Sequence, residues 1–148
     1  MGLFGKDKSE KSSSNNDLEK VLSNILVKDV MSKKLITAPP STTVHQISKM
    51  MEQGIGSVLV KKDSDTMGII TDRDFAIKIV ANKLSLDTPV EKIASFPLQT
   101  IGSNESILDA ANQMSTKKIR KLAVIEDAKV VGIITASDLI KQLSAVRK

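Results

Sequence analysis

The chain contains one short sequence pattern twice. Residues 68–75 read GIITDRDF and residues 132–139 read GIITASDL, so the two copies are 64 residues apart. Each copy combines the apolar end of a strand, a threonine, two variable residues, an aspartate and the apolar start of a helix. An internal repeat of this kind predicts two similar units that bury apolar surface together. Any site built on the threonine and the aspartate would therefore exist in two related copies.

The composition fits a globular protein and excludes several kinds of site. The chain has 148 residues, the length of one compact domain, and 41% of them are hydrophobic. Because it has no cysteine, disulfides, thiolate metal sites and thiol nucleophiles are excluded. The apolar runs are far too short to span a membrane, and no signal peptide is recognisable. We therefore expect a cytoplasmic protein that does not use the membrane.

The net charge of +5 favours anionic partners. The first 24 residues contribute no net charge, so the excess lies on the part of the chain that is expected to fold. Nucleotides, nucleic acids and acidic surfaces are candidate partners of such a surface. A mildly basic, solvated surface without a specific partner is the alternative.

The segments outside the repeats have a different composition. Residues 1–16 are rich in Lys, Ser and Asn, which predicts a disordered tail. Asp17 is expected to cap a helix over residues 17–26, because apolar residues follow it at helical spacing. The remaining chain divides into a first repeat (27–81), a linker (82–89) and a second repeat (90–145).

Each repeat is expected to contain a short helical turn, three strands and two longer helices, because apolar runs alternate with turn and capping residues. The first repeat has its turn at 27–31, strands at 35–38, 57–62 and 66–70, and helices at 44–53 and 72–81. The second repeat has its turn at 90–93, strands at 98–101, 122–126 and 130–134, a helix through 107–114 and a closing helix at 136–144.

This ordered set of segments resembles a tandem pair of cystathionine-beta-synthase (CBS) domains. The resemblance covers about residues 25–145 and implies an α/β fold, in which two β-α-β-β-α repeats pack through their sheets with pseudo-two-fold symmetry. It rests on VKDVM at 27–31 followed by Ile36-Thr37, on the two Gly-Ile-Ile-Thr-x-x-Asp units, and on the hairpin strands SVLV at 57–60 and LAVI at 122–125.

The resemblance also implies a function. CBS pairs bind adenosine-containing ligands such as AMP, ADP, ATP, S-adenosylmethionine or NAD in the cleft between the repeats. They commonly form homodimers, and they regulate a fused or separate partner without catalysing a reaction. For this chain the resemblance implies an adenine nucleotide as regulatory ligand, no catalytic cofactor and a separate, unknown regulated protein.

The Thr-x-x-Asp units have a chemical reason to bind a nucleotide. A carboxylate can accept hydrogen bonds from both hydroxyls of a ribose, and such charge-assisted bonds are strong. The resemblance therefore assigns ribose and phosphate contacts to Thr71 and Asp74 in one site, and to Thr135 and Asp138 in the other. The alternative is structural: Ser/Thr-x-x-acid at a helix start is a capping box. The two roles do not exclude each other.

The base is expected to occupy an aliphatic pocket, because the chain has no Trp or Tyr. The resemblance places this pocket between the first strand and the hairpin of each repeat. Core packing is the alternative role of the same residues. In the first site they are Thr37, Ala38, Pro39, Ile55 and Val58, and in the second site they are Thr100, Ile101, Gly102, Ile119 and Leu122. Ser57 is also expected among the residues that bind the nucleotide.

Cations are distributed unequally between the two copies. The second repeat carries Lys117, Lys118, Arg120 and Lys121 before its hairpin, where the first repeat has no positive charge. Arg73 lies inside the first Thr-x-x-Asp unit. We expect Arg73, Arg120 and Lys121 to favour a phosphorylated ligand over a bare nucleoside. A solvated basic edge is the alternative.

Three other functions are ranked below a nucleotide sensor. A nucleic-acid binder would suit the charge, but the chain lacks an aromatic stacking platform and a recognition helix. An enzyme would need more than a single histidine, His45, without a paired-carboxylate or phosphate-loop signature. A purely structural CBS module would have lost its ligand, yet both copies keep the threonine and the aspartate. No metal site is expected.

Overall fold

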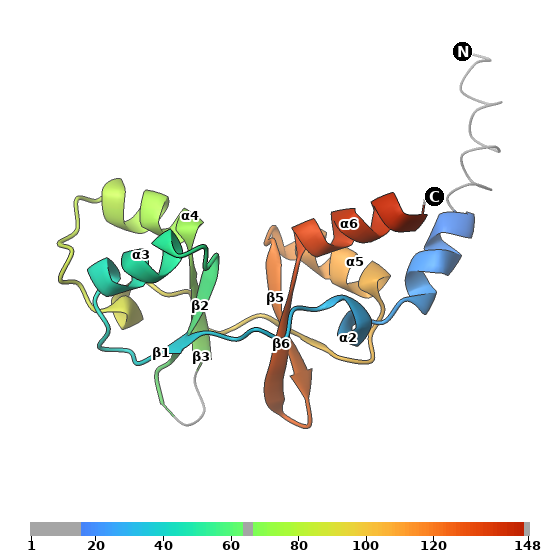
Figure 1. The fold of residues 1–148 in the computed structure, drawn as a ribbon, viewed down its shortest axis with the longest axis horizontal. Coiled ribbons are helices and arrows are strands. Elements are labelled where there is room, and N and C mark those ends of the chain that lie inside the picture. Colours follow the sequence, from blue (N-terminus) through green and yellow to red (C-terminus); the bar gives the residue numbers. More distant parts are fainter. Residues whose placement is uncertain (1–15, 64–66, 147–148) are drawn as a thin grey trace, which may run out of the picture. The chain divides into compact units, whose positions relative to one another are not determined.

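The computed structural model describes residues 16–63 and 67–146, which form two compact units (Figure 1). Within the described residues, one unit lies in Lys34–Gln99, and the other combines residues 16–33 with residues 100–146. We call them the first-sheet unit and the second-sheet unit. Each is built around its own three-stranded sheet with helices, which confirms the expected α/β class.

The sheet of the first-sheet unit has the strand order β1-β2-β3. Strand β1 runs parallel to β2, and β2 forms an antiparallel hairpin with β3. Helix α3 connects β1 to β2, and β3 continues directly into α4 and then into a π-helix. The bounds are β1 (Thr37–Ala38), α3 (Val44–Glu52), β2 (Ser57–Lys61), β3 (Met67–Thr71), α4 (Asp72–Asp74) and the π-helix (Phe75–Val80).

Sequence signals at both ends of α3 explain its bounds. Thr43 caps the helix: its Oγ1 accepts a hydrogen bond from Gln46 N at 3.2 Å, and Gln46 Oε1 accepts one from Thr43 N at 3.0 Å. Gly54 follows the helix with φ of +91°, a conformation that glycine adopts without strain. Between these ends, Val44 and Ile47 are fully buried against the sheet.

The second-sheet unit repeats this order as β4-β5-β6, with β4 parallel to β5 and β5 antiparallel to β6. Helix α5 connects β4 to β5, and β6 continues into α6. The side chains of Ile107, Leu122 and Ile134 join α5 and the sheet in one core. The bounds are β4 (Thr100–Gly102), α5 (Ile107–Lys117), β5 (Lys121–Glu126), β6 (Lys129–Thr135) and α6 (Ala136–Val146).

The short helix that opens each sequence repeat packs on the sheet of the other repeat. Helix α2 (Val27–Val30) precedes the first repeat's strands, yet Val27 is fully buried in the core of the second-sheet unit. The 3-10 helix Val90–Lys92 precedes the second repeat's strands, yet Val90 is fully buried in the core of the first-sheet unit. The packing units therefore exchange their opening helices relative to the sequence repeats.

Backbone bridges hold these exchanged segments in place. Ser32 and Ile133 exchange two backbone hydrogen bonds of 2.8 and 2.9 Å, so the chain after α2 pairs with β6. Ser95 and Ile69 exchange two bonds of 2.8 and 3.1 Å, so the chain after the 3-10 helix pairs with β3. Each of these strands thereby gains a short additional partner along its free edge.

The glycine of each repeated pattern lies directly under the exchanged segment that pairs with its strand, which we also call the crossing segment. A Cβ atom added at Gly68 would lie 2.6 Å from the carbonyl oxygen of Ser95 and 2.6 Å from the Phe96 ring. A Cβ atom added at Gly132 would lie 2.9 Å from the carbonyl oxygen of Ser32 and would also collide with the Met31 side chain. Absence of a side chain is therefore what lets the crossing segments approach the sheets.

Several expected boundaries differ from the observed ones. Residue 16 is already helical and the N-terminal helix ends at residue 24, so the prediction that Asp17 caps a helix over 17–26 is wrong at both ends. The expected strands 35–38 and 98–101 shorten to two and three residues, because pairing begins only at Thr37 and Thr100. The expected tail at 1–16 lies almost entirely outside the described residues, as does most of the first hairpin turn.

Candidate functional site

In the first-sheet unit, the repeated threonine and aspartate lie where β3 passes into α4. Asp74 Oδ2 accepts hydrogen bonds from Thr71 N at 2.8 Å and from Thr71 Oγ1 at 3.3 Å. Asp74 Oδ1 lies 3.2 Å from Lys78 Nζ, and 13% of the Asp74 side chain is exposed. Both oxygens of this carboxylate therefore already have partners within the protein.

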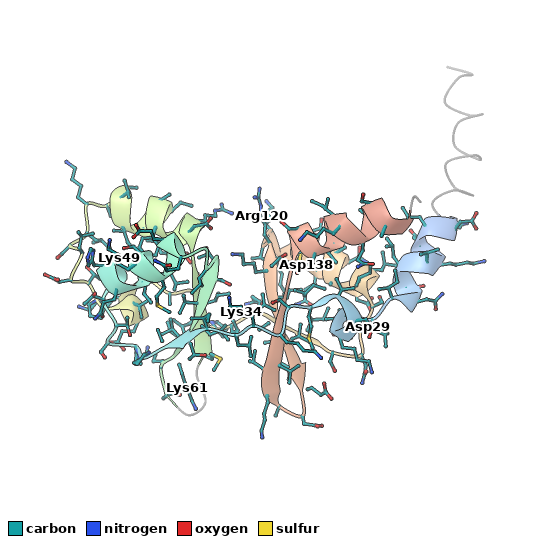
Figure 2. All side chains as sticks on the ribbon, in the orientation of Figure 1. Asp29, Lys34, Lys49, Lys61, Arg120 and Asp138 are labelled. Atoms are coloured by element: carbon teal, nitrogen blue, oxygen red, sulfur yellow. The ribbon has the colours of Figure 1, made fainter. Side chains whose placement is uncertain are left out.

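In the second-sheet unit, the same pair lies where β6 passes into α6, and Figure 2 marks Asp138 there. Asp138 Oδ2 accepts a hydrogen bond from Thr135 N at 2.9 Å, and Thr135 Oγ1 accepts one from Asp138 N at 3.2 Å. The capping role that the sequence offered as an alternative is thus confirmed. Among residues 16–63 and 67–146, no hydrogen bond or ion pair reaches Asp138 Oδ1.

Strand register brings three polar side chains of the first-sheet unit onto one face of the sheet. Thr71 lies opposite Ser57, and Thr37 lies opposite Leu59, which is two residues further along β2. Because side chains alternate along a strand, Thr37, Ser57 and Thr71 share a face. The opposite face carries Val58 and packs against the helices.

The second-sheet unit places the corresponding residues in the same way. Thr135 lies opposite Lys121, and Thr100 lies opposite Ala123, two residues further along β5. Thr100, Lys121 and Thr135 therefore share the face that points away from the helices. The one chemical difference between the two trios is that Lys121 replaces a serine, which puts a cation beside Thr135.

The residues proposed for the base pocket, together with Ser57, separate into two groups. Ala38, Val58 and Leu122 have exposures of 4, 0 and 1% and belong to the two hydrophobic cores, so the structure favours the alternative role of core packing for these three residues. Ile101, at 3%, is also a core residue. The others are partly or well exposed at the strand ends: Thr37, Pro39, Ile55, Ser57, Thr100, Gly102 and Ile119.

The expected cations also gather near these strand ends. Arg120 is exposed directly before β5, where Figure 2 labels it, and its carbonyl oxygen accepts a hydrogen bond from Ala136 N at 2.8 Å. This bond ties the residue before β5 to the first residue of α6, two positions before Asp138. Arg73 is exposed in the first turn of α4. The structure thus places a cation beside each Thr-x-x-Asp unit.

Sequence reasoning missed one residue of this region, Lys78. Its ammonium group contacts Asp74 Oδ1 and also donates to the carbonyl oxygen of Ile93 at 2.8 Å and to Ser95 Oγ at 3.2 Å. The signal was present, because an acid followed by a lysine four residues later on a helix is a recognised ion-pair spacing. The contacts to residues 93 and 95 depend on the exchanged segment, which no local pattern predicts.

Two further observations concern other kinds of site. No three His, Cys, Asp or Glu side chains of the described residues come together in a way that could hold a metal ion. His45 is exposed on α3. None of the helices in the described ranges has the length and apolarity to cross a membrane.

Comparison with known proteins identifies two matching segments. Residues 27–81 and 87–145 each match the model of the CBS domain. Among curated proteins, CBS domain-containing protein YhcV of Bacillus subtilis is 32% identical over 120 residues, which are 80% of this chain and 86% of the relative. Two further curated relatives are longer, and the chain spans 62 and 61% of their lengths.

Solved structures support the same relationship. A putative signal-transduction protein with CBS domains from Burkholderia ambifaria superposes with a TM-score of 0.72 and 31% identity, covering 78% of this chain and 87% of that one. The CBS domain pair of protein MJ0100, solved in complex with 5′-methylthioadenosine and S-adenosyl-L-methionine, superposes with a TM-score of 0.69 and 29% identity, covering 83 and 98%.

Proposed function

Since the chain belongs to the CBS-domain family and carries two CBS domains in tandem, we propose that it is a regulatory module that binds an adenosine-containing ligand. The ligand would bind at the strand-to-helix turns and alter the surface that a separate partner protein recognises. In keeping with the regulatory character of CBS pairs, the proposal assigns no catalytic step to the chain. It places the module in the cytoplasm, away from membranes and nucleic acids.

The observation that carries this proposal is the Asp138 carboxylate. Its Oδ2 atom accepts a hydrogen bond at the start of α6, while Oδ1 has no partner among the described residues. Asp138 itself is half-buried. A carboxylate that is held in one orientation by a hydrogen bond from Thr135 N is well placed to accept hydrogen bonds from the vicinal hydroxyls of a ribose. The ligands bound by the MJ0100 domain pair, which both contain adenosine, support the same class.

Cations support a phosphorylated member of that class. Arg120 precedes β5 and Lys121 is its first residue, beside the second Thr-x-x-Asp unit, and Arg73 lies within the first. Guanidinium groups bind phosphate oxygens through two parallel hydrogen bonds, and ammonium groups bind them as point charges. AMP, ADP or ATP would use these side chains, whereas S-adenosylmethionine, which is itself cationic, would not.

Exposed apolar side chains are candidates for the surface that meets a partner or a second copy in a homodimer. Val80 of the π-helix and Ile140 of α6 are 73 and 64% exposed. Both residues belong to helical segments that follow the Thr-x-x-Asp units. Because these helices start at the proposed sites, a ligand that shifts a helix start would also shift this surface.

A dye-based melting panel tests the proposal, because the protein has no Trp or Tyr to report unfolding. The ligands are AMP, ADP, ATP, S-adenosylmethionine, NAD and, as a control base, GMP. A ligand at 100 times its dissociation constant stabilises a protein by about 2.7 kcal/mol, which raises Tm by about 5–10 °C at this size. We expect such a shift with an adenine ligand and none with GMP. No shift with any adenosine compound would refute the proposal.

A further inference from the structure

Lys78 makes the two Thr-x-x-Asp units chemically unequal. Its ammonium group has three N–H donors, and three acceptors surround it: Asp74 Oδ1 at 3.2 Å, the carbonyl oxygen of Ile93 at 2.8 Å and Ser95 Oγ at 3.2 Å. The lysine is thus fully used by the protein, and 37% of its side chain is exposed. It occupies the helix position four residues after Asp74.

The second repeat has no such lysine. The residue four positions after Asp138 is Gln142, which is half-buried and carries no charge. No ion pair among the described residues therefore engages the Asp138 carboxylate, whereas the charge of Asp74 is compensated by the ammonium group. An acceptor already paired with a cation gains less from a ligand hydroxyl, because the ligand must compete with that cation.

Resting on the proposed function, we propose that Lys78 is a specificity-determining residue that weakens ribose binding at Asp74. The Asp138 site is then the tighter adenosine site of the pair, and the module responds to the ligand in two steps. The first step fills the Asp138 site. The second, at higher ligand concentration, requires Asp74 to accept the ribose while Lys78 loosens its contact with Oδ1.

The consequence of the second step follows from the other partners of Lys78. Ile93 and Ser95 belong to the exchanged segment that bridges to Ile69 on β3. Because one ammonium group makes all three contacts, we expect its bonds to this segment to change when Lys78 moves from Asp74. Occupancy of the weaker site is therefore coupled to the crossing segment, whereas occupancy of the Asp138 site is not.

A reciprocal exchange between the two repeats tests this inference by isothermal titration calorimetry with AMP. Lys78→Gln gives the first site the residue of the second, and Gln142→Lys gives the second site the residue of the first. Lys49→Gln is the matched control, because Lys49 forms an exposed ion pair with Glu52 in the same unit, with side chains 64 and 62% exposed, outside both sites. Asp138→Ala identifies which binding phase belongs to Asp138.

We expect two unequal phases in the wild-type protein, with the tighter one lost in Asp138→Ala. Lys78→Gln should strengthen the weaker phase by about twofold to fivefold, the range for losing a partly exposed competing charge. Gln142→Lys should weaken the tighter phase by a similar factor, and Lys49→Gln should change neither. Equal wild-type phases, or a weaker phase that Lys78→Gln leaves unchanged, would overturn the inference alone. Absence of any AMP binding in all proteins, together with a flat melting panel, would overturn the proposed function beneath it.

Discussion

At the scale of single residues, one carboxylate serves two purposes in each repeat. The aspartate of the Thr-x-x-Asp unit holds a helix start, and in the proposed function it also accepts the ribose hydroxyls. Loss of a capping side chain costs about 1 kcal/mol of stability, so a ligand effect has to be separated from a folding effect. The chain supplies its own control, since Asp109 caps α5 with Ser106 through bonds of 3.1 and 3.4 Å outside the candidate sites.

The cations of the second site give a prediction at this scale. Replacing Arg120 and Lys121 together by alanine should weaken AMP binding by about tenfold, while adenosine binding stays nearly unchanged, because only the phosphate loses partners. The comparison of the two ligands is made by calorimetry. A matched variant, Lys28→Ala with Lys129→Ala, removes the same charge from α2 and from the opposite end of β6. An equal loss of AMP affinity in both double variants would mean that the effect comes from net charge and not from contacts of Arg120 and Lys121 with the phosphate.

At the scale of elements, the repeated glycines connect the sequence pattern to the exchange of short helices. The strand ends GIIT are apolar because they belong to the cores. The glycine in each is present for a different reason. It leaves room for the backbone of a segment that comes from elsewhere in the chain, near Ser95 in one unit and Ser32 in the other. The pattern therefore marks the place where an exchanged segment crosses the strand, in addition to the strand end and the helix start.

Alanine substitutions at three glycines should rank by the space around them. Gly68→Ala should be the most destabilising, because its Cβ would meet a backbone carbonyl and an aromatic ring at 2.6 Å. Gly132→Ala should follow, and each should cost about 1–3 kcal/mol, the range for overpacking. Gly102→Ala is the control, since its nearest contact would be the Glu105 side chain at an ordinary 3.5 Å. Urea unfolding measures all three, and a control as costly as the other two would disprove the packing explanation.

At the scale of the whole molecule, the exchange of opening helices means that a sequence repeat and a packing unit are different segments. Repeat 27–81 carries α2, whose Val27 is buried in the second-sheet unit, and it lacks Val90 and Ile93, which are buried in the first-sheet core. Burial of such apolar side chains is the main favourable term in folding. A cut at the sequence boundary would therefore remove core residues from both units.

Fragments test this difference directly. A fragment of residues 34–99 should retain more strand and helix signal, and unfold more cooperatively, than a fragment of residues 27–81. The first keeps all buried members of the first-sheet core, while the second exposes Val27 and loses two core side chains, each worth about 1.5–3 kcal/mol of burial. Circular dichroism during urea unfolding provides the measurement. Greater cooperativity of the 27–81 fragment would contradict the exchanged packing.

Local patterns predicted most elements, because periodicity, caps and turns are local. The Thr43–Gln46 capping box, Gly54 and the two hairpins needed only neighbouring residues, and the repeat itself indicated the family. The exchanged helices, the Lys78 contacts to Ile93 and Ser95, and the burial of Ala38 and Leu122 depend on distant parts of the chain. The start of the N-terminal helix was misjudged because several polar residues near Asp17 can serve as caps.

Calorimetric titration of AMP into wild-type protein, Asp138→Ala and Asp109→Ala tests the central claim most directly. All three are measured at a temperature where urea unfolding shows them to be folded. We expect Asp138→Ala to weaken the tighter binding phase at least about tenfold, because a charge-assisted hydrogen-bond acceptor is lost. Asp109→Ala should bind as the wild type does, although it loses a comparable cap. Equal affinity in Asp138→Ala and the wild type would contradict the assignment of the Thr-x-x-Asp unit to the ligand.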